Sequence, residues 1–124
     1  MVKGIGVDIL EVERMRKNIE SGGTVFLERL FTVEEIRYCE SRPNSFQHYA
    51  ARFAAKEAVS KALSTGWRGS FVWKDVEVMN DPLGKPHITL YGKLKDMLDN
   101  ACVLVSLSHS DSHVVAMVII EEQV

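Results

Sequence analysis

The sequence predicts an α+β fold: a single small mixed domain in which an antiparallel-rich sheet packs on one long helix and shorter helices. Three observations lead to this prediction. Residues 4–9 alternate between apolar and small or polar side chains, as a β-strand does. Residues 45–64 form an alanine-rich helical run, and strand-like alternation returns in the second half of the chain. We therefore expect one domain over residues 1–124, with roughly four helices and five strands.

Size, composition and charge narrow the function classes. The 124 residues are 46% hydrophobic and 26% charged, which is ordinary for a soluble domain. No stretch approaches the ~20 consecutive apolar residues of a membrane span, and the first residues lack the zones of a secretory signal. Because the net charge is −2, we expect neither nucleic acid nor membrane as a partner. Cys39 and Cys102 lie in unrelated apolar segments, which predicts reduced thiols and a cytoplasmic protein.

The first two predicted elements bring an acidic residue close to a basic helix. One face of the strand over residues 4–9 is apolar, and the other carries only two glycines and Asp8. An amphipathic helix follows over residues 12–21, until Gly22-Gly23 break it. Its basic outer side consists of Arg14, Arg16 and Lys17.

Capping and turn patterns predict the other elements. Thr32 and Glu35 fit a capping box, so a helix should begin there. The long helix over residues 45–64 should end at Gly66. Asp81-Pro82-Leu83-Gly84 is typical of a tight turn in a hairpin. The strands of that hairpin, a short helix and two final strands are expected over residues 72–78, 88–90, 93–100, 103–107 and 114–120, and the last strand is apolar on both faces.

The long helix carries charges on a surface that otherwise favours burial. Arg52, Lys56 and Ser60 form one row with a spacing of four residues. Two cations one turn apart on a mostly buried helix require an anion between them, and a phosphate would serve.

Glu57 and Lys61 form the adjacent row and leave two interpretations open. A glutamate four residues before a lysine is the favourable orientation of an ordinary helix salt bridge. Glu57, however, projects to the middle of an apolar stripe that includes Phe53, where a carboxylate needs a cation. Mg²⁺ takes only one or two protein carboxylates, and Asp8 would supply a second. Two acids beside a basic row predict a site for a metal and a diphosphate.

His109 lies between two serines and near Asp111. Adjacent residues at a strand end cannot fold back into a Ser/His/Asp triad. A loop histidine that donates to a phosphate, or only caps the turn, fits the pattern better.

Several blocks of the sequence together resemble the phosphopantetheinyl transferase superfamily. They are Gly4-Ile5-Gly6-Val7-Asp8 followed by Arg14; Arg52-Phe53-Ala54-Ala55-Lys56-Glu57-Ala58 with Ser60-Lys61-Ala62 and Thr65-Gly66; Gly84-Lys85-Pro86; and Val105-Ser106-Leu107-Ser108-His109-Ser110. The resemblance covers nearly the whole chain, and the short bacterial synthases of the superfamily fit best. It implies the 4′-phosphopantetheinyl transferase fold. It also implies Mg²⁺-dependent transfer of the 4′-phosphopantetheine arm of coenzyme A to a serine of an acyl carrier protein, with release of adenosine 3′,5′-bisphosphate, in fatty acid biosynthesis.

The resemblance also implies roles for individual residues. Asp8 and Glu57 would hold Mg²⁺, and Lys61 would lie beside the transferred phosphate. In the implied reaction we expect Glu57 to accept the proton of the serine, directly or through a metal-bound water. The coenzyme A cleft would be lined by Arg52, Phe53, Lys56, Ser60, Gly66, His109 and Ser110. The short members are homotrimers with clefts at the subunit boundaries, which agrees with a final strand that is apolar on both faces.

The acyl carrier protein, an acidic partner, would dock on the basic side of the first helix. Arg14 would make the main contact, and Arg16, Lys17 or Arg29 would add to it. The competing interpretation is a non-catalytic nucleotide-binding module, which would keep the basic row but would need neither Asp8 nor Lys61. A phosphohydrolase is a more distant alternative.

Overall fold

The computed structural model describes residues 1–63 and 71–123 and has the predicted α+β architecture. In chain order its elements are β1 (Val2–Glu11), α1 (Val12–Leu30), α2 (Val33–Glu40), α3 (Ser45–Ala62), the 3-10 turn η1 (Trp73–Asp75), β2 (Val76–Asn80), β3 (Pro86–Leu90), α4 (Gly92–Met97), β4 (Ala101–His109) and β5 (His113–Glu122).

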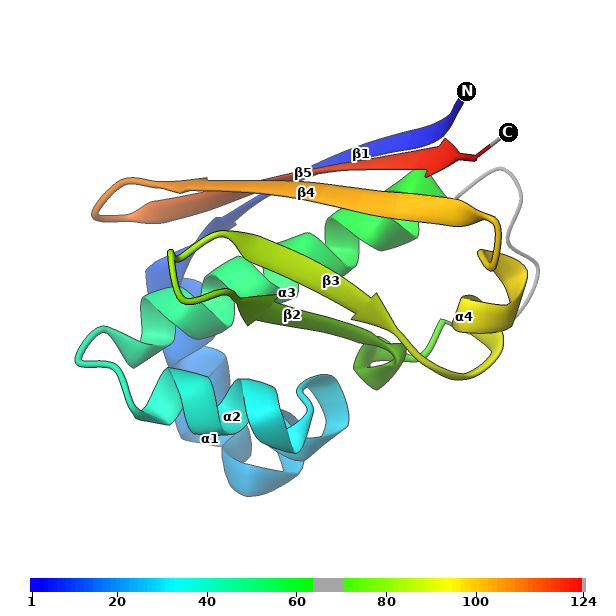
Figure 1. Ribbon diagram of the computed structural model, residues 1–124. Coiled ribbons are helices and arrows are strands. Elements are labelled where there is room, and N and C mark those ends of the chain that lie inside the picture. Colours follow the sequence, from blue (N-terminus) through cyan, green and yellow to red (C-terminus); the bar gives the residue numbers. More distant parts are fainter. Residues whose placement is uncertain (64–70, 124) are drawn as a thin grey trace.

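Two antiparallel sheets surround the long helix α3. The larger sheet has the strand order β1-β5-β4, and the smaller one is the β2-β3 hairpin. Figure 1 shows α3 lying under the larger sheet, with the hairpin beside it and α1 and α2 at the far side. As predicted, α3 is buried around most of its circumference, and its alanines allow this close packing.

The close contact between β1 and α3 depends on the two glycines of the predicted strand. A Cβ on Gly4 would lie 2.1 Å from the Ala62 carbonyl oxygen, and one on Gly6 would lie 1.9 Å from that of Ala58. The nearly bare face of β1 is therefore its inner face. Its apolar face, Ile5, Val7 and Ile9, is 57–65% exposed and forms one edge of the outer surface of the sheet.

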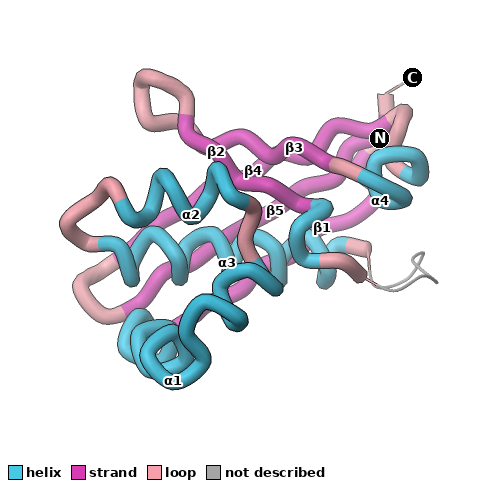
Figure 2. The backbone as a smooth tube through the Cα atoms, turned by 90° about the horizontal axis from the view of Figure 1, so that it is seen from below, coloured by secondary structure: helices cyan, strands magenta, loops and turns pink. Residues whose placement is uncertain are grey.

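The helices before α3 differ in part from the prediction. The capping box at Thr32 and Glu35 is confirmed at the start of α2. The predicted break at Gly22-Gly23 is confirmed, because Gly23 has a φ of 60° and is not helical, but a second helical arm that was not predicted follows it to Leu30. Figure 2 shows this bent α1 running beside α3. Packing of Leu27 and Leu30 against the core stabilises this second arm, which no local pattern predicts.

The second half of the chain follows the prediction with shifted boundaries. Gly84, with a φ of 89°, makes the expected turn after Asp81. The strand expected from residue 72 begins only at Val76, because Trp73–Asp75 form a 3-10 turn. The helix expected over residues 93–100 is α4, Gly92–Met97. Within the described residues, none of the helices is long and apolar enough to cross a membrane.

Candidate functional site

A cleft of about 600 Å³ opens where the end of β1 meets α3. We call it the Asp8 cleft. Its charged lining residues are Asp8, Arg14, Arg29, Glu57 and Lys61. Five of the charged residues singled out in the sequence thus lie together, although they come from β1, both arms of α1 and α3.

Asp8 and Lys61 form the closest polar pair in this cleft. Lys61 Nζ donates to Asp8 Oδ1 at 3.0 Å and to the Val7 carbonyl oxygen at 3.0 Å. The glycines of β1 make this contact possible, because they let the strand lie directly against the backbone of α3. Among the described residues Lys61 has its ion pair with Asp8 and not with Glu57, so the ordinary helix salt bridge is not what the structure shows.

Glu57 is half-buried beside Asp8, and its environment disfavours the ionised form. Burial raises the pKa of the Glu57 carboxyl, the negative charge of Asp8 raises it further, and Lys61 partly opposes both. Two carboxylates that repel each other at the rim of a cleft fit a divalent cation, which would relieve the repulsion. No group of three or more His, Cys, Asp or Glu side chains with metal-ligand geometry occurs in the described part of the chain. The pair fits Mg²⁺, which needs few protein ligands when substrate phosphates and water complete its shell.

The basic residues expected to bind a partner separate into two groups. Arg14 and Arg29 line the Asp8 cleft from the two arms of α1. Arg16 instead forms ion pairs with Glu13 and, at 2.6 Å, with Glu20 on its own helix. The structure therefore leaves Arg14 and Arg29 better placed than Arg16 to meet an acidic partner at this cleft.

A second cleft, the Arg52 cleft of about 280 Å³, lies on another side of α3. The side chain of Arg52 is buried there, with its guanidinium 4.3 Å from the centre of the Tyr38 ring and Nη2 donating to Asn80 Oδ1 at 2.8 Å. Arg52 Nε is the buried side-chain polar atom without a partner among the described residues. A buried guanidinium with an unused donor is a suitable anion-binding group.

His109 belongs to the Arg52 cleft rather than to the Asp8 cleft. Its Nδ1 accepts from Gln47 Nε2 at 2.9 Å. Ser110 follows in the turn, where its Oγ accepts from the backbone amides of Ser112 and His113. Among the described residues of this turn there is no Ser/His/Asp triad, and His109 is exposed at the Arg52 cleft.

The prediction that Lys56 lines the coenzyme A cleft and binds a phosphate is wrong. Its side chain is fully buried, and its anion is the carboxylate of Glu35, with Nζ 2.8 Å from Oε1, not an external phosphate. The sequence argument correctly required a counter-ion but assigned the wrong one, since a partner on another helix leaves no local pattern. Lys56 therefore does not line either cleft.

The other residues predicted to line the coenzyme A cleft are Ser60, Gly66 and Phe53. Ser60 is half-buried on the row of Arg52 and lines neither cleft. Gly66 lies outside the described residues. Phe53 lines the Asp8 cleft, and not the Arg52 cleft that holds Arg52 and His109, with which it was predicted to bind coenzyme A.

Sequence reasoning missed the aromatic and apolar side of the site. Phe26 and Trp73 line the Asp8 cleft, and Tyr38 and Gln47 line the Arg52 cleft. Nothing in the local pattern distinguishes them from core or surface residues. Only the way in which distant elements meet reveals them.

Comparison with known proteins identifies the family of the chain. Residues 4–118 match the family model of the 4′-phosphopantetheinyl transferase superfamily. The chain is 47% identical to a holo-[acyl-carrier-protein] synthase of Geobacter sp. (strain M21), over 98% of this chain and 99% of the relative. The crystal structure of a synthase from Neisseria meningitidis superimposes with a TM-score of 0.89, at 33% identity, over 98% and 100% of the two chains. A synthase from Bacillus anthracis, solved in complex with CoA (3′,5′-ADP), gives a TM-score of 0.83 at 35% identity over 99% of each chain.

Proposed function

The chain belongs to the 4′-phosphopantetheinyl transferase superfamily, among the holo-[acyl-carrier-protein] synthases, and we propose that it transfers the 4′-phosphopantetheine arm of coenzyme A to a serine of an acyl carrier protein. The observation that carries this proposal is the meeting of Asp8, Glu57 and Lys61 in one cleft. Coenzyme A as the donor is supported by the relative from Bacillus anthracis, which was solved with CoA.

The chain's own residues have distinct parts in the proposed reaction. The serine oxygen attacks the β-phosphorus of coenzyme A, and adenosine 3′,5′-bisphosphate leaves with the electrons of the broken P–O bond. Lys61 neutralises charge on the transferred phosphoryl group, since positioning and charge stabilisation dominate such transfers. Glu57 is placed to accept the serine proton, directly or through a water molecule. Asp8 and Glu57 would hold Mg²⁺, which supplies further neutralisation of the diphosphate.

The carrier protein would approach from the side of α1. Arg14 and Arg29 lie at the cleft and offer positive charge to an acidic surface. A charged rim of this kind speeds association and aligns the partner, while the chemistry takes place further in. The overall reaction would serve fatty acid biosynthesis in the cytoplasm.

We infer that the working form is a homotrimer. The Asp8 and Arg52 clefts share no lining residue, so one chain alone does not bring Arg52 and His109 to Glu57. The outer face of the larger sheet exposes Ile5, Val7, Ile9, Leu104 and Met117, and no described element covers it. A patch of this kind is typical of a subunit interface. A neighbouring copy on this face would add its Arg52 cleft to the Asp8 cleft. Met117→Glu should therefore give monomers in light scattering, and these monomers should be inactive in the transfer assay.

One experiment separates transfer from simple nucleotide binding. The protein is incubated with an apo carrier protein, coenzyme A and Mg²⁺, and the intact mass of the carrier is measured. We expect a gain of one phosphopantetheine that disappears when the metal is chelated. Binding of coenzyme A with no mass gain, under conditions in which a known synthase modifies the same carrier, would instead favour the non-catalytic module.

A further inference from the structure

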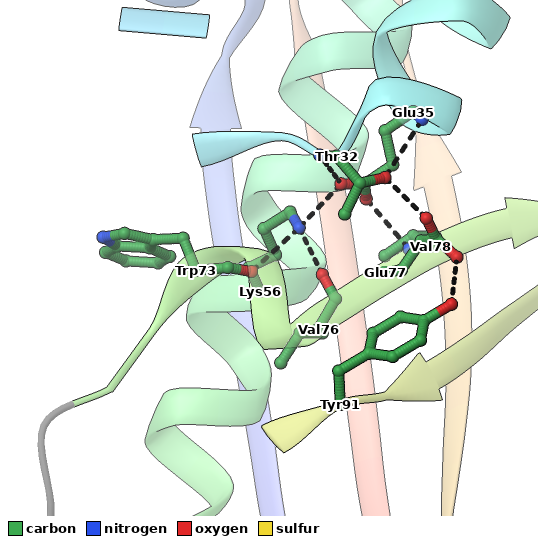
Figure 3. Close-up of polar contacts among 8 residues, drawn as sticks. All are labelled: Thr32, Glu35, Lys56, Trp73, Val76, Glu77, Val78 and Tyr91. Carbon is green, nitrogen blue, oxygen red and sulfur yellow. Dashed lines mark hydrogen bonds and ion pairs between the residues drawn. The ribbon is translucent and has the colours of Figure 1, made fainter. Parts of the chain in front are cut away.

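A buried ion pair between Lys56 and Glu35 joins α3 to α2 (Figure 3), and neither residue lines the Asp8 or the Arg52 cleft. Lys56 Nζ donates to three acceptors: Glu35 Oε1 at 2.8 Å, the Trp73 carbonyl oxygen at 3.0 Å and the Val76 carbonyl oxygen. An ammonium group has three donors, so its bonding capacity is filled. We call Lys56, Glu35 and these two carbonyls the buried clamp.

Glu35 connects the same ammonium to two more elements. Its Oε1 also accepts from the backbone amide of Thr32 at 2.9 Å, and its Oε2 accepts from that of Val78 at 2.9 Å. Both side chains of the pair are fully buried. The clamp therefore ties α2, α3 and the η1–β2 segment to one another through a single pair of charges.

The clamp reaches the Asp8 cleft through Trp73. While the carbonyl of Trp73 is held by Lys56, its indole lies 5.2 Å from the ring of Phe53, centre to centre. Phe53 and Trp73 both line the Asp8 cleft, beside Glu57. They form an aromatic wall next to the acids and Lys61.

We propose that Lys56 is a positioning residue that fixes this wall, and that the wall contacts the uncharged pantetheine arm of coenzyme A. The inference rests on the proposed function. Its basis is that a buried charge pair is costly and often replaceable by apolar residues for stability alone. Here the ammonium holds a backbone carbonyl of the one wall residue that lies outside α3. An apolar wall suits the amide-containing arm better than the charged diphosphate beside it.

The test uses the full-length protein with Trp67→Phe, so that Trp73 is the only tryptophan. Two variants remove the clamp: Lys56→Met, and Lys56→Met together with Glu35→Gln, which leaves no uncompensated buried charge. Ile120→Ala, a core truncation towards the other end of the larger sheet from Asp8, is the control for general loss of stability. Acrylamide quenching of Trp73 is measured without substrate, and steady-state kinetics with both substrates.

We expect both clamp variants to increase quenching of Trp73 and to raise KM for coenzyme A about tenfold or more, since small displacements in a reaction site are costly. KM for the carrier protein should stay unchanged, and Ile120→Ala should change neither readout. Unchanged quenching and unchanged KM in the folded double variant would overturn the proposal, as would a rise in the carrier protein's KM alone. The quenching readout does not depend on activity, so it remains decisive even if the transfer reaction itself is not observed.

Discussion

Lys56 and Lys61 lie on the same helix and have similar local bonding, yet they occupy opposite environments. Each binds one carboxylate, at 2.8 Å for Lys56–Glu35 and 3.0 Å for Lys61–Asp8, and backbone carbonyl oxygens, two for Lys56 and one for Lys61. The side chain of Lys56 is 0% exposed and that of Lys61 is 53% exposed. The two lysines therefore differ in their exposure to solvent rather than in the kind of group they bind, and only Lys61 is accessible to a substrate.

The difference has an energetic reason. Burial lowers the pKa of Lys56, and Glu35 counteracts the effect, so the ammonium depends on its partner. Lys61 is half exposed and the Asp8 side chain is 16% exposed, so their ion pair is partly solvated and Lys61 can exchange Asp8 for a phosphate more easily than a fully buried lysine could exchange its partner. The fully buried pair is structural, whereas the partly solvated pair leaves Lys61 able to meet a substrate.

The comparison predicts its largest effect on stability. Lys56→Met should reduce the free energy of unfolding by about 3–5 kcal/mol, because it leaves Glu35 as an uncompensated buried charge. Lys61→Met should change it by about 0.5 kcal/mol or less. Urea denaturation of the two variants measures both values. Equal losses in the two variants would contradict the assignment of different roles.

The opposite order is expected for activity. Lys61→Ala and Asp8→Asn should lower kcat by about 10²–10³, the usual effect of removing one group that stabilises charge in a transition state. Circular dichroism should show intact folds, and the affinity of the Lys61 variant for coenzyme A should change little. A Lys61→Ala enzyme with wild-type kcat would return Lys61 to the role of an ordinary surface lysine.

The same two residues mark the limit of sequence reasoning. Helix and strand periodicity are local properties, so they placed Glu57 on an apolar stripe and Asp8 on the bare strand face, whereas the role of Lys61 followed from the resemblance to the family. Glu35 was recognised only as a cap, since its pairing with Lys56 depends on how α2 meets α3. The inner and outer faces of β1 became clear only from the approach of α3 to Gly4 and Gly6.

A smaller effect is expected at the rim of the Asp8 cleft. Arg14→Glu should raise KM for the carrier protein about tenfold and flatten its salt dependence, because screening acts over ~10 Å at 0.1 M salt. Arg16→Glu is the matched control on the same helix, and its effect should be smaller, since Arg16 is already paired with Glu13 and Glu20. KM for coenzyme A should not change. If both Michaelis constants rise together in the Arg14 variant, Arg14 belongs to the coenzyme site instead.

The smallest expected effect is a gain in stability at Glu57. The folded-state pKa of Glu57 is raised above its ordinary value of 4.5, so the folded protein disfavours the carboxylate. Below pH 4.5 the group is protonated in both states and has no such cost; as the pH rises through the folded-state pKa, the cost becomes complete. Glu57→Gln should therefore stabilise the metal-free protein at pH 7 and not at pH 4. The gain should be about 0.5 kcal/mol or less, since the group is still partly solvated.

Mg²⁺ should remove the stability advantage of Glu57→Gln over the wild type at pH 7. A cation held by Asp8 and Glu57 relieves their repulsion, so adding Mg²⁺ should raise the melting temperature of the wild type and have little effect on Glu57→Gln. The control is Glu28→Gln, which removes an acidic side chain from α1 rather than from α3, and this variant should respond to Mg²⁺ as the wild type does. Thermal unfolding at pH 4 and pH 7, with and without Mg²⁺, measures all of these differences. If Glu57→Gln destabilises the metal-free protein at pH 7, Glu57 contributes to stability in the same way as Glu35, and the two regions do not differ as proposed.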